Sequence, residues 1–150
     1  MLSKNDLTIS PFQQFEKWFE EAKSANLPEP TAMNLATADR LGRPASRVVL
    51  LKHFDENGFV FYTNYESRKA RQIAENAFVA LTFFWQPLGY QIRIEGQARK
   101  TDAATSDAYF NSRAPGSRVG AIASPQSQVI PNRDFLEKRV DEVEAGGHLE

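Results

Sequence analysis

Apolar residues recur at helical spacing near the start of the chain, at Phe12, Phe15, Phe19 and Ala22. Charged residues fill most of the positions between them. Ser10 followed by Pro11 is a typical helix start, because serine caps the first turn and proline fits the first helical position. The pattern therefore predicts an amphipathic helix over residues 11–26 that covers a sheet.

Strand-like runs follow this helix and are separated by turn signals. The predicted strands span residues 31–37, 46–54, 59–63, 77–85 and 90–100. Short turns at residues 39–42 and 55–58 join the first three, which predicts a three-stranded meander. The fourth run, AFVALTFFW, is apolar throughout, so we expect it to be buried on both faces. The fifth alternates between apolar and polar residues, which is typical of a strand with one polar face.

Helical patterns occupy the rest of the chain. They are predicted at residues 67–75, 101–112, 118–123 and 132–145, with loops at 113–117 and 124–128. The last helix is expected to end at Gly146-Gly147. Strands followed by helices favour an α+β fold, here a small antiparallel β-barrel, closed or nearly closed, with flanking helices. We expect residues 1–150 to form a single domain.

Composition narrows the classes of function. The net charge of −1 argues against a general nucleic-acid binder, which would usually be basic. The chain has no cysteine, and His53 and His148 share no metal-ligand spacing, so we expect neither thiol chemistry nor a metal site. The N-terminal residues lack the apolar run of a signal peptide, and no segment is long enough to span a membrane. We therefore expect a cytoplasmic protein.

Cations gather where the predicted helix 67–75 begins. Ser67 is a good N-cap, and Arg68 and Lys69 follow it directly. A helix start carries unpaired N–H groups and the positive end of the peptide dipole, so added cations make a site suited to a phosphate. The alternative is an ordinary surface helix with solvated charges.

Two further cations bracket the apolar run RVVLLK. Arg47 and Lys52 are five residues apart, so a regular strand would direct them to opposite faces. If both serve one site, the strand contains a bulge, or the two side chains reach sites on different subunits.

Five segments resemble a known family: PFQQFEKWFEEA, PTAMNLATAD, RVVLLKHFDENGFVFYTNYESRKARQI, YFNSRAPGSRVGA and SPQSQVI. Their order and spacing, over about residues 11–140, resemble those of the pyridoxine/pyridoxamine 5′-phosphate oxidases. The resemblance implies an FMN-binding split β-barrel that works as a homodimer with the flavin at the subunit interface. It also implies oxidation of pyridoxine or pyridoxamine 5′-phosphate to pyridoxal 5′-phosphate, with molecular oxygen as the electron acceptor.

The resemblance also implies roles for individual residues. It places FMN against Arg47, Val48, Val49, Leu50, Leu51, Lys52, Tyr62, Thr63, Arg68, Lys69, Gln91, Gln126 and Ser127. Arg68 and Lys69 would hold the flavin phosphate, in agreement with the helix-start argument. The apolar residues between Arg47 and Lys52 would contribute mainly backbone contacts. No residue is nominated as a general base, because the flavin carries the redox step.

The phosphate of the B6 substrate is assigned by the resemblance to Lys52, Tyr109, Arg113 and Ser117. Tyr109 and Arg113 are four residues apart, so a helix continued by one turn would direct both the same way. With Ser117 in the following loop, they offer two hydroxyls and a fork of N–H donors, which suits a dianion. Taken alone, Arg113 would be an ordinary cation that compensates a helix dipole.

The sequence departs from the family at its C-terminal end. Family members continue into strands with a tryptophan and an arginine that touch FMN, and into an Arg-x-His segment that covers the substrate ring. No segment here matches these, and His148 is not a substitute. We expect FMN binding to be retained and oxidase activity to be weak or absent. Three alternatives remain: an oxidase of the phenazine-biosynthesis type, a non-catalytic FMN or pyridoxal-phosphate carrier, and a split-barrel dimer without cofactor.

Overall fold

Two antiparallel sheets form the centre of the computed structural model, which describes residue 3 and residues 6–146. The larger sheet has the strand order β2-β1-β5-β6, and the smaller is the hairpin β3-β4. The strands are β1 (Ala32–Ala38), β2 (Pro44–Leu50), β3 (His53–Asp55), β4 (Gly58–Val60), β5 (Phe78–Trp85) and β6 (Tyr90–Gln97). In the larger sheet β2 and β6 are therefore edge strands, and β1 lies between β2 and β5.

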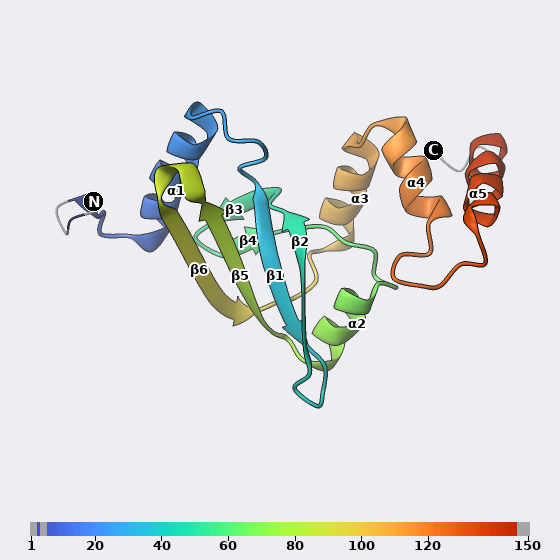
Figure 1. Cartoon of the computed structure of the whole chain (residues 1–150), viewed down its shortest axis with the longest axis horizontal. Coiled ribbons are helices and arrows are strands. Elements are labelled where there is room, and N and C mark those ends of the chain that lie inside the picture. The colour runs from blue at the N-terminus through green and yellow to red at the C-terminus, as the bar shows by residue number, and fades with distance from the viewer. Residues whose placement is uncertain (1–2, 4–5, 147–150) are drawn as a thin grey trace.

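Helices lie at both sides of the larger sheet. They are α1 (Pro11–Ser24), α2 (Arg68–Glu75), α3 (Ala103–Ser112), α4 (Pro115–Ala123) and α5 (Arg133–Ala145), with a 3-10 turn η2 (Gln86–Leu88) before β6. Figure 1 shows α3, α4 and α5 beyond the β2 edge, and α2 near the lower end of β1 and β2. No helix of the described residues is long and apolar enough to cross a membrane.

The core is a cluster of aromatic rings between α1 and the two sheets. Phe15 of α1 is almost fully buried and lies within 6 Å, centroid to centroid, of rings from α1, β3, β4 and β5. These rings are Phe19, Phe54, Phe59, Phe83 and Trp85. The helical spacing predicted this buried face, and α1 ends where Ala25 caps it, just before Asn26 adopts a positive φ of 51°.

Both hairpins of the predicted three-stranded meander form, but its middle strand is not continuous. The run predicted as one strand over residues 46–54 ends at Leu50, and β3 pairs only with β4. The chain changes partner at this break: the N–H of Leu51 still donates to Thr31, whereas the N–H of Lys52 donates to Val60. The predicted third strand also ends early, so Tyr62 and Thr63 follow β4 instead of lying within it.

The expected burial of β5 on both faces is also wrong. Leu81, Phe83 and Trp85 face the core, but Phe78 and Phe84 on the opposite face are 67% and 64% exposed. The alternation of β6 is confirmed, because Gln91, Arg93 and the other polar residues lie on the exposed face. The sheet therefore has an outer face with exposed apolar side chains, which we call the outer sheet face: Val48, Leu50, Phe78 and Phe84, with Gln91 and Arg93 beside them.

The C-terminal helices differ in detail from expectation. Helix α3 ends at Ser112, and Arg113 adopts an extended backbone, so the helix does not continue through Arg113. Helix α4 begins at Pro115, so Ser117 lies in a first helical turn and not in a loop. Helix α5 agrees with the prediction, with Asn132 as its N-cap. Gly147 and His148 lie outside the described residues.

Candidate functional site

A hollow of about 460 Å³ opens beside β2, where the edge strand, α2 and the α3–α4 region meet. We call it the β2 hollow. Its lining residues are Val48, Val49, Leu50, Lys52, Tyr62, Thr63, Lys69, Tyr109, Arg113, Ala114, Ser117 and Gln126. All but Ala114 are residues that the sequence singled out. The fold therefore brings residues up to 78 positions apart in the sequence to one hollow. Figure 1 shows β2, α2, α3 and α4 around this region.

One wall of the hollow is aromatic and cationic. The rings of Tyr62 and Tyr109 stack at 3.8 Å, almost parallel, which joins the segment after β4 to α3. The ammonium of Lys52 lies 5.8 Å from the centre of the Tyr109 ring. Arg113 and Ser117 line the same hollow from the end of α3 and the start of α4. The four residues assigned to the substrate phosphate thus come together, although the helix does not run continuously between them.

The opposite wall is the beginning of α2. Ser67 is fully buried and caps this helix, its hydroxyl accepting a hydrogen bond from the N–H of Ala70. Lys69 donates to the side-chain carbonyl of Gln126 at 2.9 Å, which ties the helix to the loop after α4. The hydroxyl of Thr63 lies 3.3 Å from that of Ser67. Hydroxyls, N–H groups and a cation therefore share one small region.

Arg47 takes part in a buried network behind this wall. Its guanidinium donates to the carbonyl of Leu35 at 3.1 Å and to the hydroxyl of Thr37 at 2.7 Å. That hydroxyl donates in turn to the side-chain carbonyl of Gln72 at 2.7 Å. Arg47 also reaches Gln72 directly, at 3.4 Å. The network joins β1, β2 and α2, and fixes the guanidinium on the core side of the sheet.

The cations near α2 lower one another's proton affinity. Burial, and then the charge of Arg68, lower the pKa of Arg47. Burial, and then the charge of Arg47, lower the pKa of Lys69. No acidic residue in the described part of the chain forms an ion pair with any of the three. Arg47 and Lys69 are half-buried, and Arg68 is exposed. Three neighbouring cations without a carboxylate partner fit the phosphate of a cofactor such as FMN.

Five of the predicted site residues do not line the β2 hollow. Arg47 and Arg68 belong to the cationic group behind it, and Leu51 points into the core with 4% exposure. Ser127 neighbours Gln126 and has a positive φ of 63°. Gln91 is on β6, at the edge opposite β2, so three strand spacings of roughly 4.8 Å each separate it from the hollow.

Sequence reasoning missed Thr37 and Gln72. Thr37 continues the alternation of Met33 and Leu35 in β1, so its inward direction was readable from the period of two. Gln72 had no such signal, because a glutamine among Arg68, Lys69 and Arg71 resembles one more solvent-facing residue of a polar helix surface.

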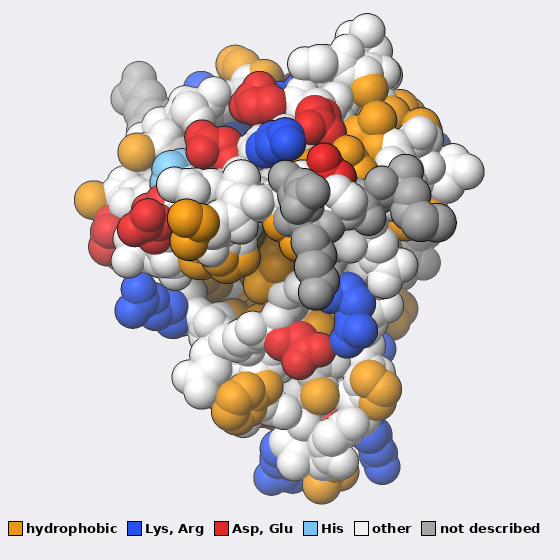
Figure 2. Space-filling model, turned by 90° about the vertical axis from the view of Figure 1, so that its left-hand side faces the viewer, with side chains coloured by type: hydrophobic (Ala, Val, Ile, Leu, Met, Phe, Trp, Pro, Cys, Tyr) orange, Lys and Arg blue, Asp and Glu red, His pale blue; other side chains and the backbone are white. Residues whose placement is uncertain are grey.

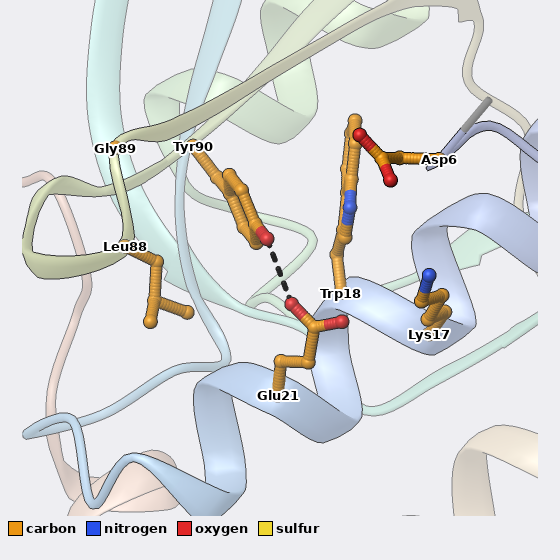
Figure 3. A pocket seen from close by; sticks show the side chains of 7 residues that line it. All are labelled: Asp6, Lys17, Trp18, Glu21, Leu88, Gly89 and Tyr90. Carbon is orange, nitrogen blue, oxygen red and sulfur yellow. Dashed lines mark hydrogen bonds between the residues drawn. The ribbon is translucent and has the colours of Figure 1, made fainter. Parts of the chain in front are cut away.

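A second hollow, of about 550 Å³, lies beside α1 and is lined by Asp6, Lys17, Trp18, Glu21, Leu88, Gly89 and Tyr90. Figure 3 shows the hydroxyl of Tyr90 directed at Glu21, to which it donates at 2.8 Å, and this bond raises the pKa of Tyr90. The ring of Trp18 stacks on that of Tyr90, with 4.9 Å between their centroids. Figure 2 shows acidic side chains gathered on the upper part of the face at this end of the molecule. This second hollow does not suit a phosphate, because the carboxylates of Asp6 and Glu21 outnumber the single ammonium of Lys17.

Comparison with known proteins shows the family to which the chain belongs. Residues 19–145 match the family model described as pyridoxamine 5′-phosphate oxidase. A pyridoxine/pyridoxamine 5′-phosphate oxidase of Crocosphaera subtropica is 56% identical over 142 residues, and one of Paraburkholderia phytofirmans is 54% identical over 138. These matches cover 95% and 92% of the chain. They cover 66% and 65% of the relatives, so the chain spans slightly less than two thirds of their length.

Solved structures agree with these matches. The protein PhzG of Burkholderia lata, solved with tetrahydrophenazine-1-carboxylic acid, has a TM-score of 0.91 and 31% identity, covering 98% of this chain and 74% of PhzG. An FMN-binding protein of Nostoc punctiforme, related to pyridoxamine 5′-phosphate oxidase, has a TM-score of 0.67 and 19% identity, covering 87% of this chain and 73% of that protein, and supports the fold alone. The chain therefore belongs to the pyridoxamine 5′-phosphate oxidase family, whose fold is the FMN-binding split barrel and whose cofactor is FMN.

Proposed function

We propose that this chain binds FMN at the β2 hollow and oxidises pyridoxine or pyridoxamine 5′-phosphate to pyridoxal 5′-phosphate, with molecular oxygen as the electron acceptor. One observation carries the proposal: two groups of cations flank a single hollow. Arg47, Arg68 and Lys69 lie at the α2 side, and Lys52 and Arg113 line the α3 side. A phosphorylated cofactor and a phosphorylated substrate together need two such groups.

The α2 side suits the phosphate of FMN. Lys69 and Arg68 begin the helix, where the peptide dipole and unpaired N–H groups also favour an anion. The rest of the flavin would lie along β2, which as an edge strand has backbone groups directed away from β1. Val48 to Leu50 would contact it there, with Tyr62, Thr63, Gln126 and Ser127 closing the site.

The α3 side suits the phosphate of the vitamer. Arg113 supplies a planar fork of donors, Lys52 a second positive charge, and Tyr109 and Ser117 hydroxyl groups. The stacked pair Tyr62–Tyr109 holds this side of the hollow in place. Because the set is built for a dianion, it favours a phosphorylated substrate over an uncharged aromatic one.

The protein's own residues bind and orient in this proposal. FMN, when bound, supplies the redox chemistry by accepting a hydride from the substrate and returning electrons to oxygen. Lys52, Tyr109, Arg113 and Ser117 hold the vitamer at one end, so that its reacting carbon faces the flavin. The cations of the site would stabilise negative charge on a bound flavin. No residue of the chain is assigned as a general base.

We also propose that a second copy of the chain completes the site. The outer sheet face exposes Val48, Leu50, Phe78 and Phe84, an apolar surface of the kind that protein interfaces bury. Gln91 lies on this face but far from the β2 hollow of its own chain. Pairing of two such faces would cover the apolar residues and give Gln91 a path to the partner's flavin.

A phenazine-type oxidase is the second candidate, and the similarity to PhzG favours it. Over the aligned residues PhzG is 31% identical to this chain, whereas the two pyridoxine/pyridoxamine 5′-phosphate oxidases are 56% and 54% identical. The phosphate-binding set at the α3 side also favours the B6 substrate. A phenazine precursor carries a carboxylate in place of the phosphate dianion.

The decisive experiment adds FMN to the purified chain and measures both flavin binding and pyridoxal 5′-phosphate formation. Arg68→Ala should weaken flavin binding about tenfold, the effect of losing one charge-assisted hydrogen bond. Arg113→Ala should leave flavin binding unchanged and raise the KM for the vitamer phosphate by a similar factor.

The outcomes separate the candidates. A colourless protein that takes up no FMN refutes the proposal entirely. Flavin binding without turnover selects a non-catalytic carrier of FMN or pyridoxal phosphate. Faster oxidation of a tetrahydrophenazine carboxylate than of either B6 phosphate selects the phenazine type.

A further inference from the structure

The buried network around Arg47 has an unusual composition. Thr37 and Gln72 are 3% and 5% exposed, and Arg47 is half-buried beside them. Every acceptor that the guanidinium uses is uncharged: a backbone carbonyl, a hydroxyl and an amide oxygen. Buried arginines are commonly paired with a carboxylate, which neutralises them. Here uncharged groups satisfy the hydrogen bonds of Arg47, and its positive charge is not neutralised by them.

The retained charge acts at the start of α2. Burial is the larger cause of both lowered pKa values, but the charge of Arg47 also lowers the pKa of Lys69 and the charge of Arg68 that of Arg47, so the three cations share one electrostatic region. Asp39 feels the charge of Arg68 but accepts hydrogen bonds from the backbone of Leu41 and Arg43. Asp39 therefore keeps its negative charge, but it lies outside the network and forms no ion pair with any of the three cations among the described residues.

We propose that Thr37 and Gln72 are positioning residues for the cofactor phosphate, which hold Arg47 through uncharged acceptors so that its full charge stays available to that phosphate. The inference rests on the proposed binding of FMN at α2. Gln72 also anchors α2 to β1 through Thr37, which fixes Arg68 and Lys69 relative to Arg47. Neither residue needs to touch the cofactor.

The substitution that tests this is Gln72→Glu. It retains the shape and an acceptor for both Thr37 and Arg47, so the fold should persist, but it adds the negative charge that the network excludes. We expect the affinity for FMN to fall at least about tenfold, because the phosphate competes with a carboxylate for Arg47. The affinity for riboflavin, which lacks the phosphate, should not change. Fluorescence titration with both flavins gives the ratio directly.

The matched control is Gln13→Glu, which adds the same charge on an exposed position of α1. It should leave both affinities unchanged. A wild-type protein that binds neither flavin refutes the proposed function itself. A wild-type protein that prefers FMN, together with a Gln72→Glu variant that prefers it equally strongly, overturns only the present inference. Equal loss of affinity for both flavins would likewise overturn it, because a merely structural role predicts that result.

A second pair of variants covers the case in which Gln72→Glu does not fold. Thr37→Val removes the hydroxyl between Arg47 and Gln72 with little change of volume, and Thr37→Ser restores it. The valine variant should lose several-fold in FMN affinity but not in riboflavin affinity, and the serine variant should regain it. Failure of the serine variant to rescue FMN binding would refute the positioning role of the hydroxyl.

Discussion

Lys69 is the residue whose ionisation should limit binding at high pH. Burial and the charge of Arg47 lower the pKa of its ammonium below the ordinary 10.5. A lowered pKa means that this lysine loses its proton, as the pH rises, before an exposed lysine does. We therefore predict that FMN affinity falls, by up to about tenfold, as the pH rises from neutral toward the ordinary lysine value, because a neutral amine cannot pair with the phosphate.

Fluorescence titration of FMN across this range measures the effect. The matched variant is Lys69→Arg, whose guanidinium stays charged throughout. Its affinity should be nearly independent of pH over the same interval. An equally steep decline in the arginine variant would assign the pH dependence to another group.

Phe15 carries the largest single share of the aromatic core. It is 3% exposed and contacts rings from one helix and three strands. Phe15→Ala should lower the free energy of unfolding by about 3–5 kcal/mol, since it removes apolar contacts and leaves a cavity. Urea denaturation measures this, with Ile9→Ala as a control at a fully exposed position. A loss below about 1 kcal/mol would show that the core closes around the gap.

At the scale of elements, the N-cap of α2 links stability to the site. The hydroxyl of Ser67 accepts from Ala70 within a buried setting, so Ser67→Ala should lower the free energy of unfolding by about 1 kcal/mol. It should also weaken FMN binding, because the first turn carries Arg68 and Lys69. Asn132→Ala, which removes the N-cap of α5, is the matched control. It should lower the free energy of unfolding by a similar amount and leave FMN affinity unchanged.

Local patterns predicted most elements but not their assembly. The hairpins β1–β2, β3–β4 and β5–β6 each follow from a short turn between neighbouring runs. The pairing of β1 with β5 joins segments more than forty residues apart, and no local signal specifies it. The same holds for the break after Leu50, where the backbone changes partner from Thr31 to Val60.

The site was predictable to a similar extent. Lys52, Tyr109, Arg113 and Ser117 were chosen through the family resemblance, and the fold does bring them to one hollow. The network of Thr37 and Gln72 was not found, because a polar residue in a strand or a charged helix resembles a solvent-facing one. Only the packing of α2 against β1 shows that both are buried.

At the scale of the whole molecule, the outer sheet face bears on whether one chain alone forms a complete FMN site. Helix α1 and the β3–β4 hairpin cover the inner face of the sheet, while Phe84 remains 64% exposed on the other face, near the end of β5. Gln91 is the direct neighbour of Phe84 on β6. Association through this face would therefore bury the ring and place the amide at an interface in the same step.

Phe84→Asp tests this, because a charge buried within an apolar interface opposes association. We predict that the wild-type chain sediments as a dimer and the variant as a monomer at the same concentration. The variant should also bind FMN more weakly, since Gln91 would no longer be delivered by a partner. Val129→Asp, at a fully exposed apolar position outside the sheet, should change neither property. A monomeric wild type that binds FMN as tightly as the Phe84→Asp variant would show that each chain holds its flavin alone.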